Sequence, residues 1–159
     1  MSGIILSNQK YESDVLCKVL HKAKKTFSDQ KWRLISFDNS KTSVNGKICV
    51  NKGAKKSDAN FTSKSLIFSN KAFSFSKPEL EILEDDVKCK HGASFGEIER
   101  DLIFYMQSRG IKKNDAVIML IYAFINEIEY TVKDHVNLAM QEIDKIIRNL
   151  GKKWIILKP

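Results

Sequence analysis

The chain has 159 residues, of which 43% are apolar, and it carries a net charge of +8. This length allows one domain or two small ones, and no apolar stretch reaches the roughly eighteen residues of a transmembrane helix. Three cysteines without a Cys-x-x-Cys motif argue against a disulfide framework and for a reducing compartment. Residues 1–6 lack the basic region of a signal peptide, so we expect a cytoplasmic protein that binds no membrane.

Lysine supplies almost all of the positive charge, since the sequence contains only four arginines. The lysines are scattered, with clusters at residues 22–25 and at Lys55 and Lys56. Proteins that read nucleic acid usually concentrate arginine and aromatic residues on one face. A solvated lysine surface therefore explains the composition better than nucleic-acid binding, which remains the third alternative for function.

Residues 31–88 contain short bursts of alternating apolar residues, which is the pattern of half-buried strands. In the first burst, Arg33, Ile35 and Phe37 would share one face of the strand, and Trp32 and Leu34 the other. Turn-forming residues separate the bursts at positions 38–40, 45–46, 52–53, 69–70 and 76–78. Many short strands with regular breaks indicate a sandwich, a barrel or a solenoid, and periodicity does not choose among these.

Residues 84–91 join an acidic segment, residues 84–86, to the pair Cys89 and His91. A thiolate and an imidazole two residues apart on extended backbone point to the same side, and both are ligands for iron and zinc. Structural zinc and iron–sulfur clusters usually take four ligands, so further ligands would have to come from another segment or another chain. The alternative interpretation of the pair is a buried thiol beside a surface histidine.

The other acidic residues and histidines that could act in catalysis or metal binding are explained more simply as surface residues. Glu84, Asp85 and Asp86 could act in acid–base catalysis or bind a hard cation, but a solvated acidic turn explains them more simply. His21 and His135 have no suitably spaced partner and are expected to be surface histidines.

The apolar period changes from two to about 3.6 residues near Ser94, which predicts a switch from strands to helices. Residues 94–97 have the pattern of a capping box that starts the first helix. Arg109 would lie in its last turn, and Gly110 would end it in the left-handed conformation. A second helix is expected to start near residues 114–115, and a third covers about residues 132–150.

An ordered set of short segments runs through the chain: Asn45–Ile48, Gly53–Ala59, Lys77–Ile82, Asp85–Cys89, His91–Ala93, Phe104–Tyr105 and Ser108–Ile111. In order and spacing they resemble the C-terminal part of the SufB/SufD family of iron–sulfur cluster assembly scaffold proteins, and SufD more closely. The resemblance covers about residues 30–127 and corresponds to half or less of a full-length member. It implies a right-handed parallel β-helix over residues 1–92, a helical cap over residues 93–150 and a tail over residues 151–159.

The resemblance also implies a function, that of a scaffold subunit of a SUF complex that is not itself an enzyme. Cys89 and His91 would lie at an interface with a SufB-like chain, or with a second copy of this chain. There they would supply ligands to iron or a nascent cluster that is held transiently, with no permanently bound cofactor. The alternative is a truncated, non-catalytic interaction or structural module that retains only docking to its partners.

The second expected docking site lies in the helical region, which in this family binds the SufC ATPase. The residues that the resemblance places there are Phe104, Tyr105, Arg109 and Gly110. Exposed aromatic residues together with an arginine have the composition of binding hot spots, whereas the alternative is an ordinary helix core and cap.

Overall fold

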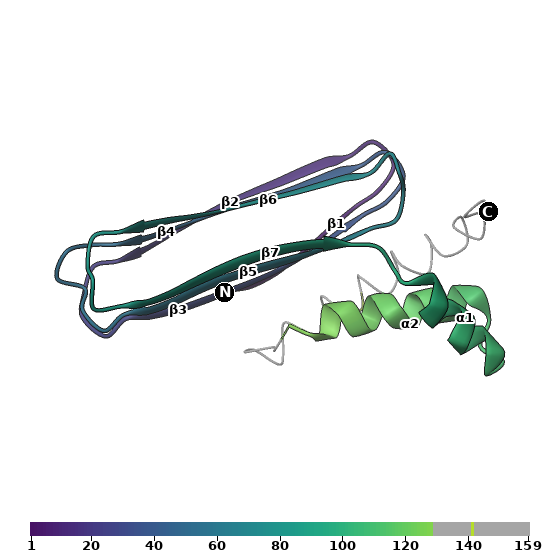
Figure 1. Cartoon of the computed structure of the whole chain (residues 1–159). Coiled ribbons are helices and arrows are strands. Elements are labelled where there is room, and N and C mark those ends of the chain that lie inside the picture. Colours follow the sequence, from purple (N-terminus) through teal and green to yellow (C-terminus); the bar gives the residue numbers. More distant parts are fainter. Residues whose placement is uncertain (129–140, 142–159) are drawn as a thin grey trace. The chain divides into compact units, whose positions relative to one another are not determined.

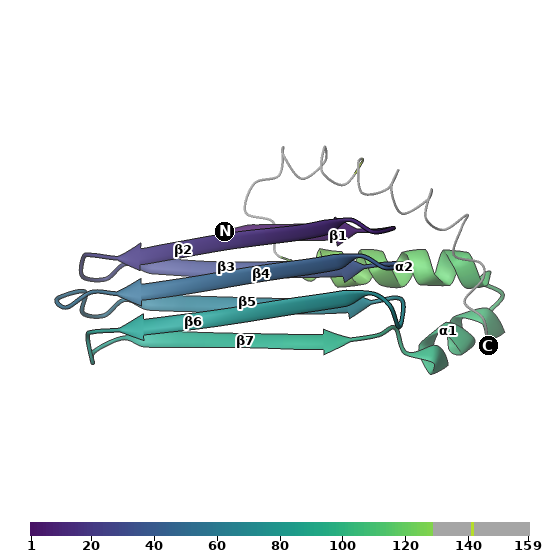
Figure 2. The same ribbon diagram turned by 90° about the horizontal axis from the view of Figure 1, so that it is seen from above.

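Seven parallel strands wind into a solenoid in residues Met1–Glu97 of the computed structural model, which describes residues 1–128 and 141 of the chain (Figure 1). The strands are β1 (Ser2–Ser7), β2 (Glu12–His21), β3 (Phe27–Ser36), β4 (Lys41–Val50), β5 (Asp58–Ile67), β6 (Phe73–Ile82) and β7 (Lys88–Gly96). They alternate between two sheets with the orders β1-β3-β5-β7 and β2-β4-β6, as Figure 2 shows from above. Every pairing is parallel, so the expected β-helix is confirmed.

The coils of the solenoid stack in register around an apolar interior. Ser2 lies beside Lys31 and Lys41 beside Phe73, so successive coils are offset by 29 to 32 residues. Because side chains alternate between the two faces of a strand, aligned coils bury continuous rows. The inward rows form one buried cluster that includes Ile5, Trp32, Leu34, Val44, Ile48, Val50, Ala59 and Phe61.

Two of the predicted turns are wrong. Asn45 and Gly46 lie inside β4, where a Cβ atom on Gly46 would come within 2.0 Å of the Phe61 ring. Glycine is thus required there because it leaves room for an aromatic ring, and the backbone does not turn. Residues 76–78 likewise lie inside β6, which is the last strand of its sheet in the described chain. Pro78 is tolerated because an edge strand does not need every N–H for pairing.

Hydroxyl groups form a separate layer inside the solenoid, towards the corner where β3 leads into β4. Each hydrogen-bonded pair joins the two walls of one coil, and the pairs are Ser7 with Ser13, Ser36 with Thr42, and Ser65 with Ser74. Thr42 also donates to Ser74 at 3.1 Å, which links two coils. These buried polar groups are therefore satisfied by one another, as buried polar groups generally are.

His21 is buried, and the prediction of a surface histidine is wrong. Only 3% of the residue is exposed, because it ends the inward row of β2. Its Nδ1 atom lies 2.6 Å from the Thr26 hydroxyl and its Nε2 atom lies 2.8 Å from the Ser28 hydroxyl. Burial lowers the pKa of this imidazole. His135 lies outside the described residues.

The second unit begins at Ile98 and contains α1 (Arg100–Ser108) and α2 (Lys113–Asn126), which pack against each other. The predicted capping box is wrong, because Ser94 belongs to β7 and α1 follows Glu99 without a side-chain cap. Gly110 has a φ of +84°, so the predicted left-handed stop is confirmed. Apart from residue 141, the expected third helix lies outside the described residues, as does the tail. Neither α1 nor α2 has the length and hydropathy needed to span a membrane.

Candidate functional site

Strand β7 is the last strand of its sheet in the described chain, and its inner face is uncovered. In register, Cys89, His91, Ala93 and Phe95 follow Ala59, Phe61, Ser63 and Ser65 of β5. The four β5 residues are buried by the coils around them, whereas β7 is exposed from Lys90 to Gly96. The last coil therefore presents to solvent a row of side chains that is equivalent to a core row.

Cys89 lies deepest in this row. It is half-buried and packs against the apolar cluster of the interior. Burial raises the pKa of its thiol, and the negative charge of Asp58 raises it further. In the isolated chain the group is thus a protonated thiol, and the thiolate would form only when a metal ion or another cation stabilises it.

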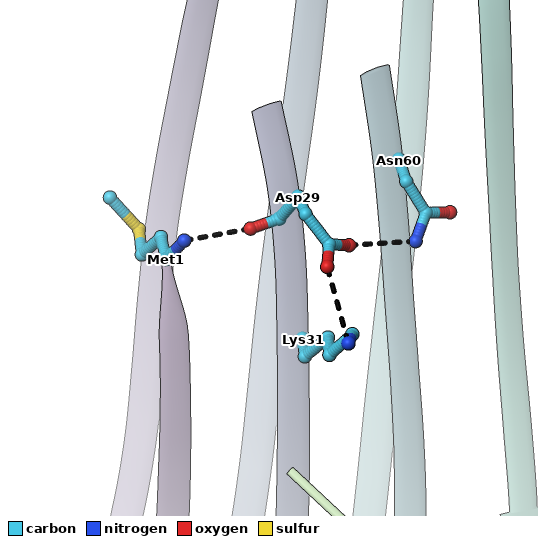
Figure 3. Close-up of polar contacts among 4 residues, drawn as sticks. All are labelled: Met1, Asp29, Lys31 and Asn60. Atoms are coloured by element: carbon cyan, nitrogen blue, oxygen red, sulfur yellow. Dashed lines mark hydrogen bonds and ion pairs between the residues drawn. The ribbon is translucent and has the colours of Figure 1, made fainter. Parts of the chain in front are cut away.

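His91 shares the inner face with Cys89, as the spacing predicted, and its side chain is exposed. Lys90, between them, lies on the outer face in the same row as Asp29 and Asn60. Figure 3 shows Asp29 and Asn60 of this row: the Asp29 carboxylate accepts a hydrogen bond from Asn60 at 2.8 Å and also pairs with Lys31, two residues along β3, at 3.2 Å. The amino group of Met1 donates to the Asp29 carbonyl oxygen at 2.7 Å.

Among the residues that the structure describes, the acidic segment is not part of a metal cluster. Glu84 accepts a hydrogen bond from the Gly53 N–H at 2.9 Å, and this bond lowers the pKa of its carboxyl group. Within residues 1–128, no group of three or more His, Cys, Asp or Glu side chains is arranged to hold a metal ion. Cys89 and His91 can therefore provide two ligands, and this part of the chain brings no third to them.

An apolar rim surrounds the same coil, and the sequence did not reveal it. Its exposed members are Phe73, Phe75, Ile82, Leu83 and Phe95. Phe73 and Phe75 point outward because Ser74, between them, occupies the inward row. The sequence contained one sign of this orientation: the hydroxyls of Ser74 and Ser76 continue the inward polar layer of the preceding coils, so the phenylalanines that alternate with them must face outward. Apolar patches of this kind mark interaction surfaces.

The expected ATPase-docking residues lie on and after α1. Phe104 and Tyr105 are exposed by 74% and 55%, so neither fills the core of the helical unit. The Arg109 guanidinium lies 5.3 Å from the centre of the Tyr105 ring, which is a cation–π distance. The Ser108 hydroxyl donates to the Tyr105 carbonyl oxygen at 2.7 Å. Together with Gly110 they form an aromatic–arginine surface at the end of the helix.

Fold and site define a β-solenoid protein with an uncovered last coil and a helical unit. Comparison with known families adds that residues 1–124 match the SufBD core domain of the SUF system of FeS cluster assembly. The chain thus belongs to the SufBD family, and the match extends further towards the N-terminus than residues 30–127.

Several curated proteins are similar to this chain. It is 40% identical over 123 residues to the iron–sulfur cluster assembly protein SufD of Escherichia coli, which is 77% of this chain and 29% of SufD. It is 30% identical to SufB of Bacillus subtilis over 123 residues, 77% of this chain and 26% of SufB. A SufBD family protein of Synechocystis is 43% identical over 83 residues, 52% of this chain and 18% of that protein. The chain spans less than a third of the length of these relatives.

Proposed function

We propose that this chain is a scaffold subunit of a SUF complex in which Cys89 and His91 receive iron or a nascent iron–sulfur cluster at an interface with a SufB-like chain. The observation that carries the proposal is the uncovered inner row of β7, which holds both ligands at the end of a solenoid. The names of the SufD and SufB relatives, which describe iron–sulfur cluster assembly, support it.

The geometry limits the chemistry that this chain supplies by itself. Iron, alone or in a nascent cluster, is the substrate that this thiol can ligate, and Cys89 must lose its proton before it binds iron. A second chain that covers the last coil would add the missing ligands and would remove water from the row. A complete set of four ligands within one chain would retain the assembled cluster. A site shared between two chains, with two ligands from each, suits a scaffold that must release the cluster.

A second function is favoured by the packing of Cys89. Because this thiol is half-buried against the core and its pKa is raised, it also has the features of a small apolar residue. On this alternative the chain is a docking module that binds a SufB-like or SufC-like partner without handling iron.

Metal content separates the two functions. We expect Cys89→Ala and His91→Ala to lower the iron and sulfide bound per complex, while Lys90→Ser, on the outer face, leaves both unchanged. The measurement is the iron and sulfide content after anaerobic purification with SufB-like and SufC-like chains. Equal metal content in the complexes of the three variants and of the parent chain would leave the docking module as the function.

A folding control accompanies these variants. Cys89 contacts the core, so Cys89→Ala should lower the free energy of unfolding by about 1 kcal/mol. The exposed His91 fills no core position, so His91→Ala should leave it nearly unchanged. If the variants lose bound iron in proportion to their loss of unfolding free energy, and not according to which residue was changed, the result would count against direct ligation.

ATPase docking gives a second test of the scaffold. Replacing both Tyr105 and Arg109 by alanine should weaken binding of a SufC-like ATPase about thirtyfold, since such hot spots contribute about 2 kcal/mol. Binding is measured by calorimetry with the purified ATPase. Gln107→Ala is the matched control, because this residue is exposed on the same helix without a ring contact. Unchanged binding in the double variant would assign these residues to local helix structure alone.

A further inference from the structure

Two lysine clusters from separate parts of the sequence become neighbours at one corner of the solenoid. Residues 22–26 connect β2 to β3 and residues 51–57 connect β4 to β5, and these loops stack at the left of Figure 2. The Lys25 N–H donates to the Lys55 carbonyl oxygen at 2.8 Å, and the Asn51 N–H donates to the His21 carbonyl oxygen at 3.0 Å. The backbone therefore fixes the two clusters in register.

This lysine corner consists of Lys22, Lys24, Lys25, Lys52, Lys55 and Lys56, all of which are exposed. Within the described chain, none of the six lies within ion-pair distance of a carboxylate, although the charge of Lys55 helps to lower the pKa of Glu84 in the next loop. Adjacent coils lie about 5 Å apart, so these like charges repel one another. An acidic partner would relieve this repulsion and gain attraction from several lysines at once.

The extent of the corner limits the kind of partner. The next loop, residues 83–87, stacks below it through a bond of 2.6 Å from the Lys56 N–H to the Asp86 carbonyl oxygen. This loop carries Glu84, Asp85 and Asp86, so the positive surface ends abruptly after two coils. A long nucleic acid or an anionic membrane would meet these carboxylates, whereas a short acidic segment would not.

An exposed aromatic side chain lies beside the corner. Phe27 starts β3 directly after the first lysine loop, and 74% of it is exposed. Neither loop contains arginine, the residue that most often reads bases or grips phosphates. Lysines next to an aromatic ring match a protein segment that combines carboxylates with an apolar residue.

We propose that the lysine corner docks a short acidic segment of a partner protein, with an apolar side chain of that segment against Phe27. This site uses none of the residues of the proposed iron site or of the aromatic–arginine surface, and it does not depend on metal handling. Docking here would recruit a further protein to the scaffold through residues that do not ligate iron.

The test uses the full chain and a labelled synthetic peptide of alternating aspartate and glutamate with one central phenylalanine. Changing Lys24, Lys25, Lys55 and Lys56 together to glutamine should weaken binding of this peptide at least about tenfold, the loss expected for four surface ion pairs. The matched control changes the same number of exposed lysines elsewhere: Lys10, Lys18, Lys71 and Lys112. Control binding should stay within about twofold of the parent chain, because distant charges are screened.

Three further measurements complete the test. Phe27→Ala should weaken peptide binding without changing its dependence on salt, since it removes an apolar contact and no charge. A single-stranded oligonucleotide and vesicles containing phosphatidylserine should bind more weakly than the peptide. Equal losses in the two lysine variants, or tighter binding of the oligonucleotide or the vesicles, would overturn the proposal.

Discussion

Gly46→Val should lower the free energy of unfolding by about 3 kcal/mol or more, the largest effect that we expect from a single substitution. A Cβ atom at this position lies 2.0 Å from the Cε2 atom of Phe61 and 2.7 Å from its Cζ atom. Phe61 is fully buried, so its ring cannot move aside without displacing other core residues. Overpacking of this kind costs about 1–3 kcal/mol, and the two methyl groups of valine add to it. Denaturant titration of the purified chain measures the loss.

Two variants control this result. Phe61→Leu should recover part of the stability in the Gly46→Val background, because it removes ring atoms from the point of conflict. Gly92→Val on β7 should be almost neutral, since a Cβ atom there meets nothing within 4 Å. A Gly46→Val chain as stable as the parent would show that the ring is not fixed against this glycine.

Ala93→Pro should weaken association with a SufB-like chain about a hundredfold while leaving the solenoid folded. The Lys88 N–H donates to the Ser57 carbonyl oxygen at 2.9 Å, towards the rest of the sheet. In a parallel strand the N–H groups of alternate residues point to the same side. The N–H groups of Lys88, Lys90 and Gly92 therefore face β5, and that of Ala93 faces the free edge. Proline there removes one edge donor and places its ring against an added strand, for a cost of about 3 kcal/mol. The binding constant is measured with the purified partner.

The neighbouring position provides the control for this prediction. Proline in place of Gly92 removes an N–H that faces β5, so it should destabilise the solenoid itself. Ala93→Val keeps the edge donor and favours strand structure, so its association should match that of the parent. Unaltered association of the Ala93→Pro chain would mean that partners do not extend the sheet at β7.

The positions of most strands were predictable from the sequence because alternation marks a buried row in each of them, whereas the choice of a solenoid over a sandwich or barrel came from the family resemblance. Ile48 and Val50 are buried where the alternation predicted an apolar row. The errors occurred where a residue type has two uses. Gly46 and Pro78 read as turn residues, but one makes room for a ring on the facing wall and the other lies on an edge strand. Neither use depends on neighbours in the sequence, so local patterns do not predict it.

The candidate site was predictable to a smaller extent. A period of two placed Cys89 and His91 on one face, and the structure confirms that they share the inner face. The apolar rim and the lysine corner required knowledge of which coils stack on which. Lys25 and Lys55 become neighbours only because one coil lies directly upon the next. Both surfaces arise from the stacking of coils that are about 30 residues apart, and patterns within a few neighbouring residues do not contain that information.

The near-constant offset between paired strands has a consequence for how the chain folds. Every strand pairs with one that lies 29 to 32 residues away, and none pairs with a more distant segment of the described chain. Folding can therefore begin at any adjacent pair of coils and advance one coil at a time, with each finished edge as the template for the next. If a partner covers the last coil by pairing with the free edge of β7, as the Ala93→Pro variant tests, its strand would add by this same elongation step. Assembly of the complex would then be the last step of folding, carried out by a second polypeptide.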